Sequence, residues 1–239
     1  MSQVASLPRV IDYWLGGPQH TPADVAEGDR LAELHPDVPH LFRAQRAFQR
    51  HVLDTMADAG LSQFLIFKAG LPTAGHAHEQ LPEARIYYTD DNFDVVQPGA
   101  GLLAGVRRRV RYQTLDATEL ENLEDLEFSP VLKTDQPIGV FLSGACEVWD
   151  DETLKVVVNN LHAWAKPGSM LAFTHATHEA GGLSPWFQAS GGAFNLRSRL
   201  EIEKLLGEWW VGEDGVTPLA QILDEGAPAW MVGIVAKHG

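Results

Sequence analysis

Two aspartates stand where short apolar runs end, and a glycine follows a third such run. Gly70 comes after Phe64–Phe67, Asp90 comes directly after Arg85–Thr89, and Asp116 follows a further run. A glycine lets the backbone approach a ligand, and a carboxylate about twenty residues further on can accept hydrogen bonds from both hydroxyls of a ribose. A second carboxylate at the next strand end can accept a hydrogen bond from an adenine amino group. These residue types at this spacing predict a site for a cofactor that contains a nucleoside.

Small residues at two of the expected strand ends fit the same site. The run Ile138–Ser143 ends in Ser143 and Gly144, and Ala117 follows Asp116. Small side chains allow a ligand to lie close to the backbone. We therefore expect Ala117 and Ser143 to contribute to the cofactor site.

One histidine near these strand ends is a candidate for proton transfer. His175 follows the run Met170–Thr174, where a side chain could accept a proton from a substrate. His178 and Glu179 lie close by, but the spacing of the three residues matches no zinc motif with a known mechanism. These residues fit a polar rim at the mouth of the pocket, and His175 is the candidate general base if one is needed; the catalytic residue is otherwise not assigned, and we expect no metal site.

The elements that must position these residues alternate between apolar runs and helical stretches beyond Gly60, which is typical of a parallel sheet covered by helices. Ligands bind such a sheet outside the carboxyl ends of its strands, where the strand order reverses. The sequence thus predicts an α/β fold with a doubly wound, mostly parallel seven-stranded sheet. The expected strands are Phe64–Phe67, Arg85–Thr89, Val110–Thr114, Ile138–Ser143, Met170–Thr174, Trp209–Val211 and Trp230–Ala236. The expected helices are His76–Gln80, Asp94–Gly105, Thr153–Trp164 and Arg197–Leu206, with a surface loop over Ala180–Ala193.

The first sixty residues have a helical pattern instead. A short apolar segment ends at Gly16, and Thr21 followed by Pro22 predicts the start of a second helix. Apolar residues from Leu41 to Met56 repeat at helical spacing, and Gly60 predicts the end of that third helix. We expect a helical N-terminal extension over residues 1–60, packed as a lid on an α/β domain over residues 61–239.

Composition excludes several classes of partner. The 239 residues include 18 Lys and Arg against 32 Asp and Glu, and a net charge of −14 would repel nucleic acid. A single cysteine, Cys146, is typical of a reducing compartment. No signal peptide and no apolar run of about 20 residues stands in the sequence. We expect a cytoplasmic protein with no nucleic-acid or membrane partner, and the sequence leaves a homodimer open.

Six motifs occur in a specific order along the chain. They are Asp12–Gly17, Gln63–Leu65, Gly70–Thr73, His78–Glu79, Tyr88–Asp90 and Thr174–Thr177. As a set they resemble an actinobacterial-type family of S-adenosylmethionine-dependent methyltransferases, and the resemblance runs from about residue 8 to residue 237. It implies a class I methyltransferase fold, S-adenosyl-L-methionine as cofactor, and an N-terminal extension that helps to cover the cofactor. The resemblance supplies no substrate, which we expect to be a small molecule. Tyr13 and Gly16 of that extension join the expected cofactor site.

The stretch after the first strand departs from the family pattern. The family has an acid in this strand and a glycine directly after it, where this chain has Ile66 and Lys68. A side chain in place of that glycine adds strain if the backbone needs a positive φ, and an ammonium would repel the sulfonium of the cofactor. An alternative therefore stands beside the methyltransferase: a catalytically inactive relative that has lost the cofactor and serves as a binding or regulatory protein.

Overall fold

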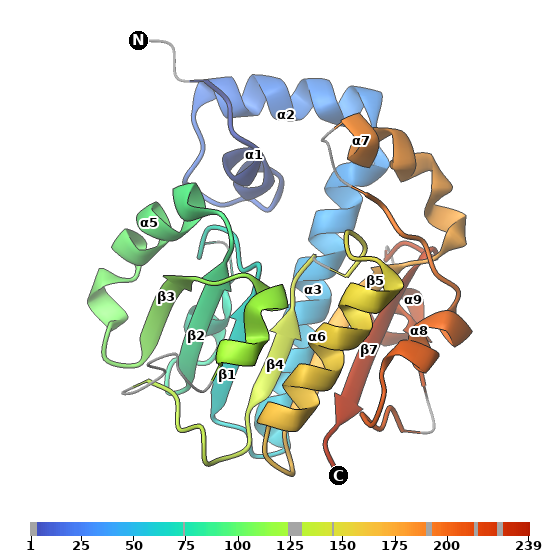
Figure 1. Cartoon of the computed structure of the whole chain (residues 1–239). Coiled ribbons are helices and arrows are strands. Elements are labelled where there is room, and N and C mark those ends of the chain that lie inside the picture. The colour runs from blue at the N-terminus through green and yellow to red at the C-terminus, as the bar shows by residue number, and fades with distance from the viewer. Residues whose placement is uncertain are drawn as a thin grey trace.

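A twisted seven-stranded sheet forms the centre of the molecule in the computed structural model, which describes residues 4–73, 75–123, 131–144, 146–189, 193–212, 215–223 and 227–239. Its strands are β1 (Gln63–Phe67), β2 (Arg85–Asp90), β3 (Val110–Thr114), β4 (Gly139–Leu142), β5 (Met170–Ala176), β6 (Thr217–Pro218) and β7 (Met231–Lys237). Their order is β3-β2-β1-β4-β5-β7-β6 (Figure 1). Strands β1 to β5 pair in parallel, and β7 pairs antiparallel with β5 and β6. The strand order reverses between β1 and β4, so the doubly wound, mostly parallel sheet is confirmed.

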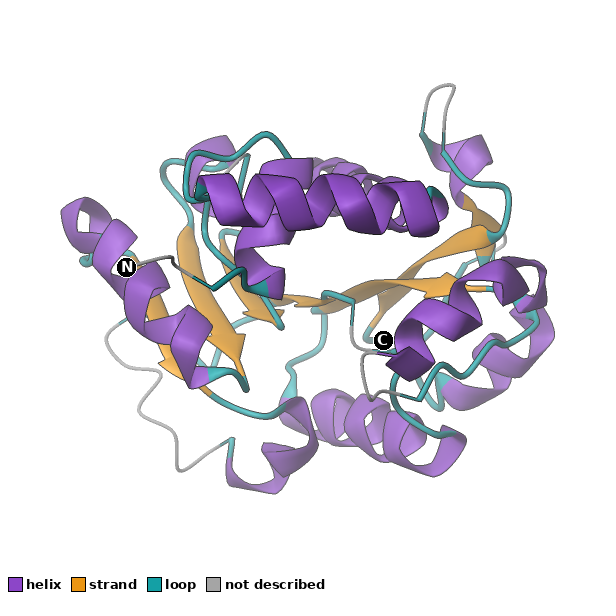
Figure 2. Cartoon of the chain, turned by 90° about the horizontal axis from the view of Figure 1, so that it is seen from above, coloured by secondary structure: helices purple, strands orange, loops and turns teal. Residues whose placement is uncertain are grey.

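Helices cover both faces of this sheet, as Figure 2 shows. They are α1 (Leu7–Trp14), α2 (Pro22–Leu34), α3 (Asp37–Asp58), α4 (Ala77–Gln80), α5 (Phe93–Leu102), α6 (Asp151–Trp164), α7 (Ser184–Ala189), α8 (Arg199–Leu205) and α9 (Leu219–Ile222), with 3₁₀ turns η1 (Ala104–Val106), η2 (Ala117–Asn122) and η3 (His178–Leu183). The expected helices correspond to α1 to α6 and α8, and their bounds are confirmed within a few residues. Asp24 caps α2 by accepting hydrogen bonds from both the backbone and the hydroxyl of Thr21, and Gly60 ends α3 with a φ of +95°.

Strand β1 shows why these apolar runs become central strands. Each of its residues from Phe64 to Phe67 is at most 1% exposed, because both faces of a parallel sheet are covered. Phe64 and Ile66 belong to the core shared with α3 and α5, whereas Leu65 and Phe67 belong to the core shared with α6 and α8. Alternate side chains thus join two separate cores and fix the sheet between the helix layers.

The expected strand over Trp209–Val211 is wrong. Trp210 forms only an isolated bridge with Lys237, and the edge strand β6 lies further along the chain. The reason lies in Trp209, whose indole is buried and donates a hydrogen bond to the Val158 carbonyl of α6 at 2.9 Å. This contact holds the segment against the helix layer and keeps it from forming a strand.

The expected surface loop over Ala180–Ala193 is also largely wrong, because η3 and α7 occupy most of it; residues 190–192 lie outside the described part. Trp186, which a loop would leave open to a ligand, is 5% exposed and packs edge-on against Phe42 of α3 at 6.1 Å. The segment is therefore part of the folded core.

The N-terminal helices reach the sheet directly. Helix α1 lies above the carboxyl ends of the strands (Figure 1), with Trp14 stacked on Phe42 at 5.9 Å. Phe48 of α3 lies 6.2 Å from Phe141 of β4, so α3 packs on the sheet itself. The division of the chain at residue 60 stays a prediction. None of the described helices combines the length and apolar character that a membrane span requires.

Candidate functional site

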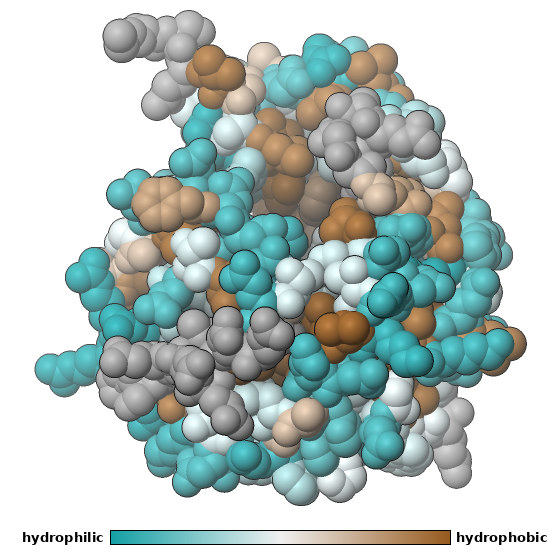
Figure 3. Space-filling model, viewed as in Figure 1, coloured by the Kyte–Doolittle hydropathy of each residue, from teal (hydrophilic) through white to brown (hydrophobic). Residues whose placement is uncertain are grey.

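A cavity of about 340 Å³ opens at the carboxyl edge of the sheet, where the strand order reverses between β1 and β4. Helix α1 covers it from above, and α3, the loop after β1 and the ends of β2 and β4 form the rest of its wall. Figure 3 shows the hollow beneath the N-terminal helices, with apolar side chains in its depth and polar ones around it. Sites for small ligands commonly enclose about 300–1,000 Å³, so one ligand of cofactor size fits here.

The loop after β1 adopts the backbone conformation that favours glycine. Lys68 has a φ of +48°, the one positive φ among the described non-glycine residues, and Gly70 has a φ of +67°. Such a conformation costs a residue with a side chain roughly 1–2 kcal/mol. The Lys68 ammonium lies 2.6 Å from an Asp91 carboxylate oxygen, so an ion pair partly compensates the charge that the sequence places beside the cavity.

Asp90 connects this loop to the end of β2. Its carboxylate is 6% exposed and accepts hydrogen bonds from the backbone N–H groups of Gly70 and Asn92, each at 3.0 Å. Burial raises the pKa of Asp90, while these two hydrogen bonds act in the opposite direction. The Tyr112 hydroxyl of β3 donates to the Gly70 carbonyl at 2.7 Å. Three adjacent strands therefore hold Gly70 and the carboxylate in fixed positions at the cavity.

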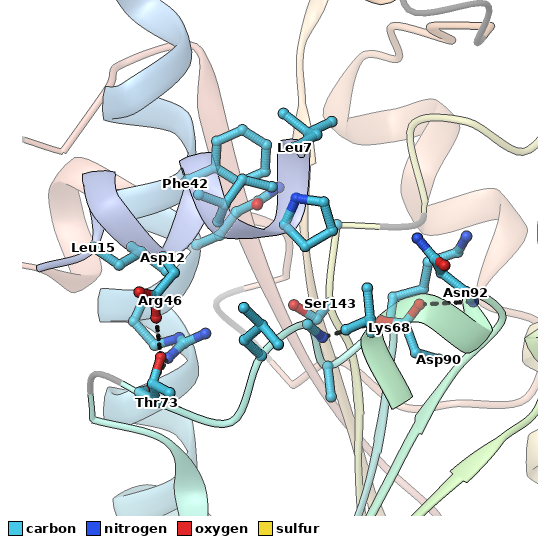
Figure 4. Close-up of a pocket in the computed structure, with 18 of the residues that line it drawn as sticks. Leu7, Asp12, Leu15, Phe42, Arg46, Lys68, Thr73, Asp90, Asn92 and Ser143 are labelled. Atoms are coloured by element: carbon cyan, nitrogen blue, oxygen red, sulfur yellow. Dashed lines mark hydrogen bonds between the residues drawn. The ribbon is translucent and has the colours of Figure 1, made fainter. Parts of the chain in front are cut away.

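A second polar group lies at the other side of the cavity, under α1. The Thr73 hydroxyl donates a hydrogen bond to the Asp12 carboxylate, which also accepts from the Gln19 N–H at 2.7 Å. Arg46 of α3 donates to the Thr73 carbonyl at 3.1 Å. Figure 4 shows Asp12, Thr73 and Arg46 on one side of the pocket and Lys68, Asp90 and Asn92 on the other. Burial lowers the pKa of Arg46 to about 10, so its guanidinium is charged at neutral pH.

Gly17 permits the contact between Asp12 and Thr73. A Cβ atom at Gly17 would overlap the Asp12 carboxylate and lie 2.8 Å from the Thr73 hydroxyl. The turn after α1 can therefore approach the loop after β1 only because this residue has no side chain.

The structure brings three of the expected cofactor residues together at the cavity and places four elsewhere. Gly70, Asp90 and Ser143 are among its lining residues, whereas Tyr13, Gly16, Asp116 and Ala117 are not. The Tyr13 hydroxyl donates to Asp29 of α2 at 2.8 Å, and Gly16 turns the chain after α1 with a φ of +77°. The Asp116 carboxylate accepts from the Thr118 N–H at 2.9 Å, at the start of η2. A role of these four in cofactor binding stays a prediction.

His175 lies at the end of β5 in a buried polar cluster with Arg197 and Glu147. Its Nε2 atom is 2.7 Å from Arg197, which can only donate, so Nε2 accepts and Nδ1 donates to the Ala176 carbonyl at 2.8 Å. Burial lowers the pKa of His175 to about 4. Glu147 in the same cluster accepts from the Ala176 N–H at 3.2 Å, and burial raises its pKa to about 7. The imidazole is therefore neutral, with both ring nitrogens occupied, and it is not among the cavity-lining residues.

Sequence reasoning did not assign the polar residues under α1. Asp12 and Thr73 stand inside the motifs Asp12–Gly17 and Gly70–Thr73, and Arg46 and Gln49 stand one helical turn apart on α3. Gln49 is 2% exposed and lines the cavity. The signal was available as polar residues within an otherwise apolar helix face, but nothing in the sequence indicated that α1 and α3 meet at this point.

Comparisons with known proteins agree with this geometry. The model of the S-adenosyl methyltransferase family matches residues 1–231. A DUF574 family protein from Streptomyces avermitilis is 26% identical, with a TM-score of 0.82 over 99% of this chain and 98% of the other. A protein described as a methyltransferase from Thermobifida fusca is 23% identical, with a TM-score of 0.82 over 98% and 95% of the two chains. No curated protein matches the chain.

A more distant likeness concerns the fold alone. Human N-acetylserotonin methyltransferase, solved in complex with S-adenosylmethionine, is 16% identical, with a TM-score of 0.50 over 90% of this chain and 60% of the other. The class I methyltransferase fold is thus confirmed together with the resemblance that predicted it. Since the family model spans nearly the whole sequence, the chain belongs to the S-adenosyl methyltransferase family.

Proposed function

We propose that this chain is an S-adenosylmethionine-dependent methyltransferase that acts on a small molecule, and that the cavity beside Gly70 and Asp90 holds the cofactor. The observation that carries the proposal is the Asp90 carboxylate, fixed by two backbone N–H groups at the switch point of the sheet and open to the cavity. Each carboxylate oxygen accepts a second hydrogen bond, so Asp90 would bind both hydroxyls of the ribose.

The charges around the cavity fit such a cofactor. Its described lining residues include three aspartates and two cations, namely Asp12, Asp90, Asp91, Arg46 and Lys68. The cavity therefore has a net negative charge, and S-adenosylmethionine has a net positive one because its sulfonium adds to a neutral zwitterion. A Cβ atom at Gly70 would meet nothing within 4 Å, so there is open space beside the loop for a ligand.

The apolar wall indicates what the protein contributes to the reaction. When bound, the cofactor supplies a methyl group made electrophilic by the sulfonium. Leu7 and Ile11 of α1 and Phe42 of α3 line the cavity and would exclude water from the reacting groups. Methyl transfer depends mainly on proximity and alignment, so the proposal does not require His175 as a base. In this scheme the extension over residues 1–60 serves as the lid.

The alternative of a lost cofactor depends on Ile66 and Lys68. Ile66 is fully buried within the sheet and is not among the cavity-lining residues. Lys68 keeps the glycine-type backbone conformation, and its ammonium is paired with Asp91. The ion pair weakens the electrostatic argument against cofactor binding, so we favour the active enzyme.

Calorimetric titration with S-adenosylmethionine separates the two functions. We expect the folded wild type to bind the cofactor, and the variant Lys68→Gly, which changes only the cavity-lining departure from the family pattern, to bind it with similar affinity. The proposal is wrong if the folded wild type shows no binding at millimolar ligand. Binding by Lys68→Gly alone would then establish the inactive relative.

A further inference from the structure

The polar group under α1 has a composition that the ribose site does not explain. It places one carboxylate, Asp12, and one guanidinium, Arg46, on the lining of the same end of the cavity. The Asp12 side chain is 1% exposed, and Arg46 is buried enough that its pKa falls to about 10. A buried carboxylate and a half-buried guanidinium at one end of a cavity match a ligand that has both an ammonium and a carboxylate group.

Gln49 supplies a second and independent indication. Its amide nitrogen is buried without a hydrogen-bond partner in the described part of the chain, although the residue lines the cavity. A buried donor left without an acceptor destabilises the structure, and a bound acceptor would remove that cost. Gln49 follows Arg46 by three residues on α3, so both side chains lie on one face of the helix. Two adjacent donors, one of them charged, suit a carboxylate.

The network around Asp12 keeps its carboxylate in place. It accepts hydrogen bonds from the Thr73 hydroxyl and from the Gln19 N–H, and the His20 ring lies 3.6 Å away. The absence of a side chain at Gly17 allows this arrangement. A fixed carboxylate needs little reorganisation when a cation binds.

We infer that Asp12, Arg46 and Gln49 bind the α-amino acid end of the cofactor, with Asp12 facing its ammonium and Arg46 and Gln49 facing its carboxylate. The inference rests on the proposed function, because it assumes that the cofactor lies in this cavity with its ribose at Asp90. It gives α1 a role in recognition as well as in covering the site. The chain would then distinguish the intact cofactor from a nucleoside that lacks the amino acid.

Two ligands test this assignment. S-Adenosylhomocysteine has the amino acid end, whereas 5′-methylthioadenosine shares its nucleoside and thioether but lacks that end. We expect calorimetry to show that Arg46→Met weakens S-adenosylhomocysteine about ten- to a hundredfold, since a charge-assisted contact is lost. Binding of 5′-methylthioadenosine should stay the same, which also shows that the variant is folded.

Two further variants keep the test decisive. Gln49→Met removes a donor that has no hydrogen-bond partner among the described residues, so it should leave folding intact and weaken only S-adenosylhomocysteine. Arg50→Met, one residue further on α3, exposed and not among the cavity-lining residues, is the matched control and should change neither ligand.

The possible failures are distinguishable. If Arg46→Met does not fold, Gln49→Met decides the outcome. If the cavity variants weaken both ligands equally, or neither, the subsite assignment is wrong while the proposed function stands. If the folded wild type binds neither ligand, the proposed function fails and the subsite with it.

Discussion

The two ends of the cavity are built in different ways. At the Asp90 end, the ligand-facing groups come from the ends of adjacent strands, and backbone N–H groups of Gly70 and Asn92 hold the carboxylate. At the Asp12 end, α1, α3 and the loop after β1 meet. The hydrogen bonds that join them to Thr73 span 61 residues from Asp12 and 27 residues from Arg46.

The fold class determines the position of the groups at the Asp90 end, whereas the groups at the Asp12 end depend on the helices of this particular chain. The carboxyl ends of parallel strands lie at one edge of the sheet whatever their side chains are. The strand order alone therefore places Asp90 at the cavity. The Asp12 end depends on how α1 packs, and there a buried carboxylate and a half-buried guanidinium compensate each other. Variants at the two ends should therefore differ in which part of a ligand they affect.

The largest effect on binding is expected at the Asp90 end. Asp90→Asn places an amide NH₂ against one of two backbone N–H donors and removes one of the two acceptors for the ribose hydroxyls. We expect calorimetry to show a loss of about 100-fold for both S-adenosylhomocysteine and 5′-methylthioadenosine. Asp94→Asn, at an exposed position of α5 that is not among the cavity-lining residues, is the control. Equal effects of the two variants would mean that Asp90 has no special role.

A smaller and ligand-specific effect is expected at the Asp12 end. Asp12→Asn removes the charge but keeps an acceptor for Thr73, so S-adenosylhomocysteine should bind about tenfold more weakly and 5′-methylthioadenosine unchanged. Asp29→Asn alters the lid away from the cavity, at the Tyr13 contact, and should change neither affinity. If Asp12→Asn lowered the affinity for both ligands equally, the two ends of the cavity would not bind different parts of the ligand.

Lowering the pH should weaken ligand binding at the Asp90 end by a few-fold. Burial raises the pKa of Asp90 above its ordinary value of 3.8, so the carboxylate gains a proton earlier than an exposed aspartate as pH falls. Affinity for 5′-methylthioadenosine should therefore decrease as pH falls, and the decrease should begin at a higher pH than an exposed aspartate would give. In Asp90→Asn this decrease should be absent, and its persistence there would assign the titration to another group.

The loop conformation should matter more for stability than for binding. Lys68→Gly and Lys68→Ala both remove the ion pair with Asp91, but only glycine relaxes the positive φ. In chemical denaturation the glycine variant should be more stable than the alanine variant by about 1 kcal/mol. Both should bind the two ligands within about threefold of wild type. A far tighter affinity in Lys68→Gly would show that the lysine obstructs the cofactor.

No effect on binding is expected from the closed cluster at the ends of β4 and β5. Burial raises the pKa of Glu147 to about 7 in the folded protein, whereas its ordinary value is 4.5. The folded state therefore holds a proton that the unfolded state has lost, and the free energy of unfolding should fall as pH rises from 4.5 to about 7. Glu147→Gln should remove this dependence in denaturation experiments and leave ligand affinity intact. A weaker affinity would extend the site to this cluster.

The sequence predicted most of the sheet because buried parallel strands are continuous apolar runs. Strands β1 to β5 lie within a few residues of the expected ranges. The two-residue β6 is too short to leave a pattern, and the aromatic Trp209–Val211 segment resembles a strand while Trp209 in fact packs on α6.

The candidate site was predictable only in part. Gly70, Asp90 and Ser143 reach the cavity because each follows directly from a strand end. His175 does not, because side chains alternate along β5 and place it on the same face as Leu171, the face covered by α6 and α8. The Asp12 end required knowledge of how distant helices pack, which no local pattern contains.

A crystal structure of the wild type with S-adenosylhomocysteine tests the central claim most directly. We predict density in the cavity with the ribose hydroxyls at Asp90 and the amino acid end beneath α1, between Asp12 and Arg46. An empty cavity at saturating ligand, or an amino acid end directed away from Asp12, would contradict the account.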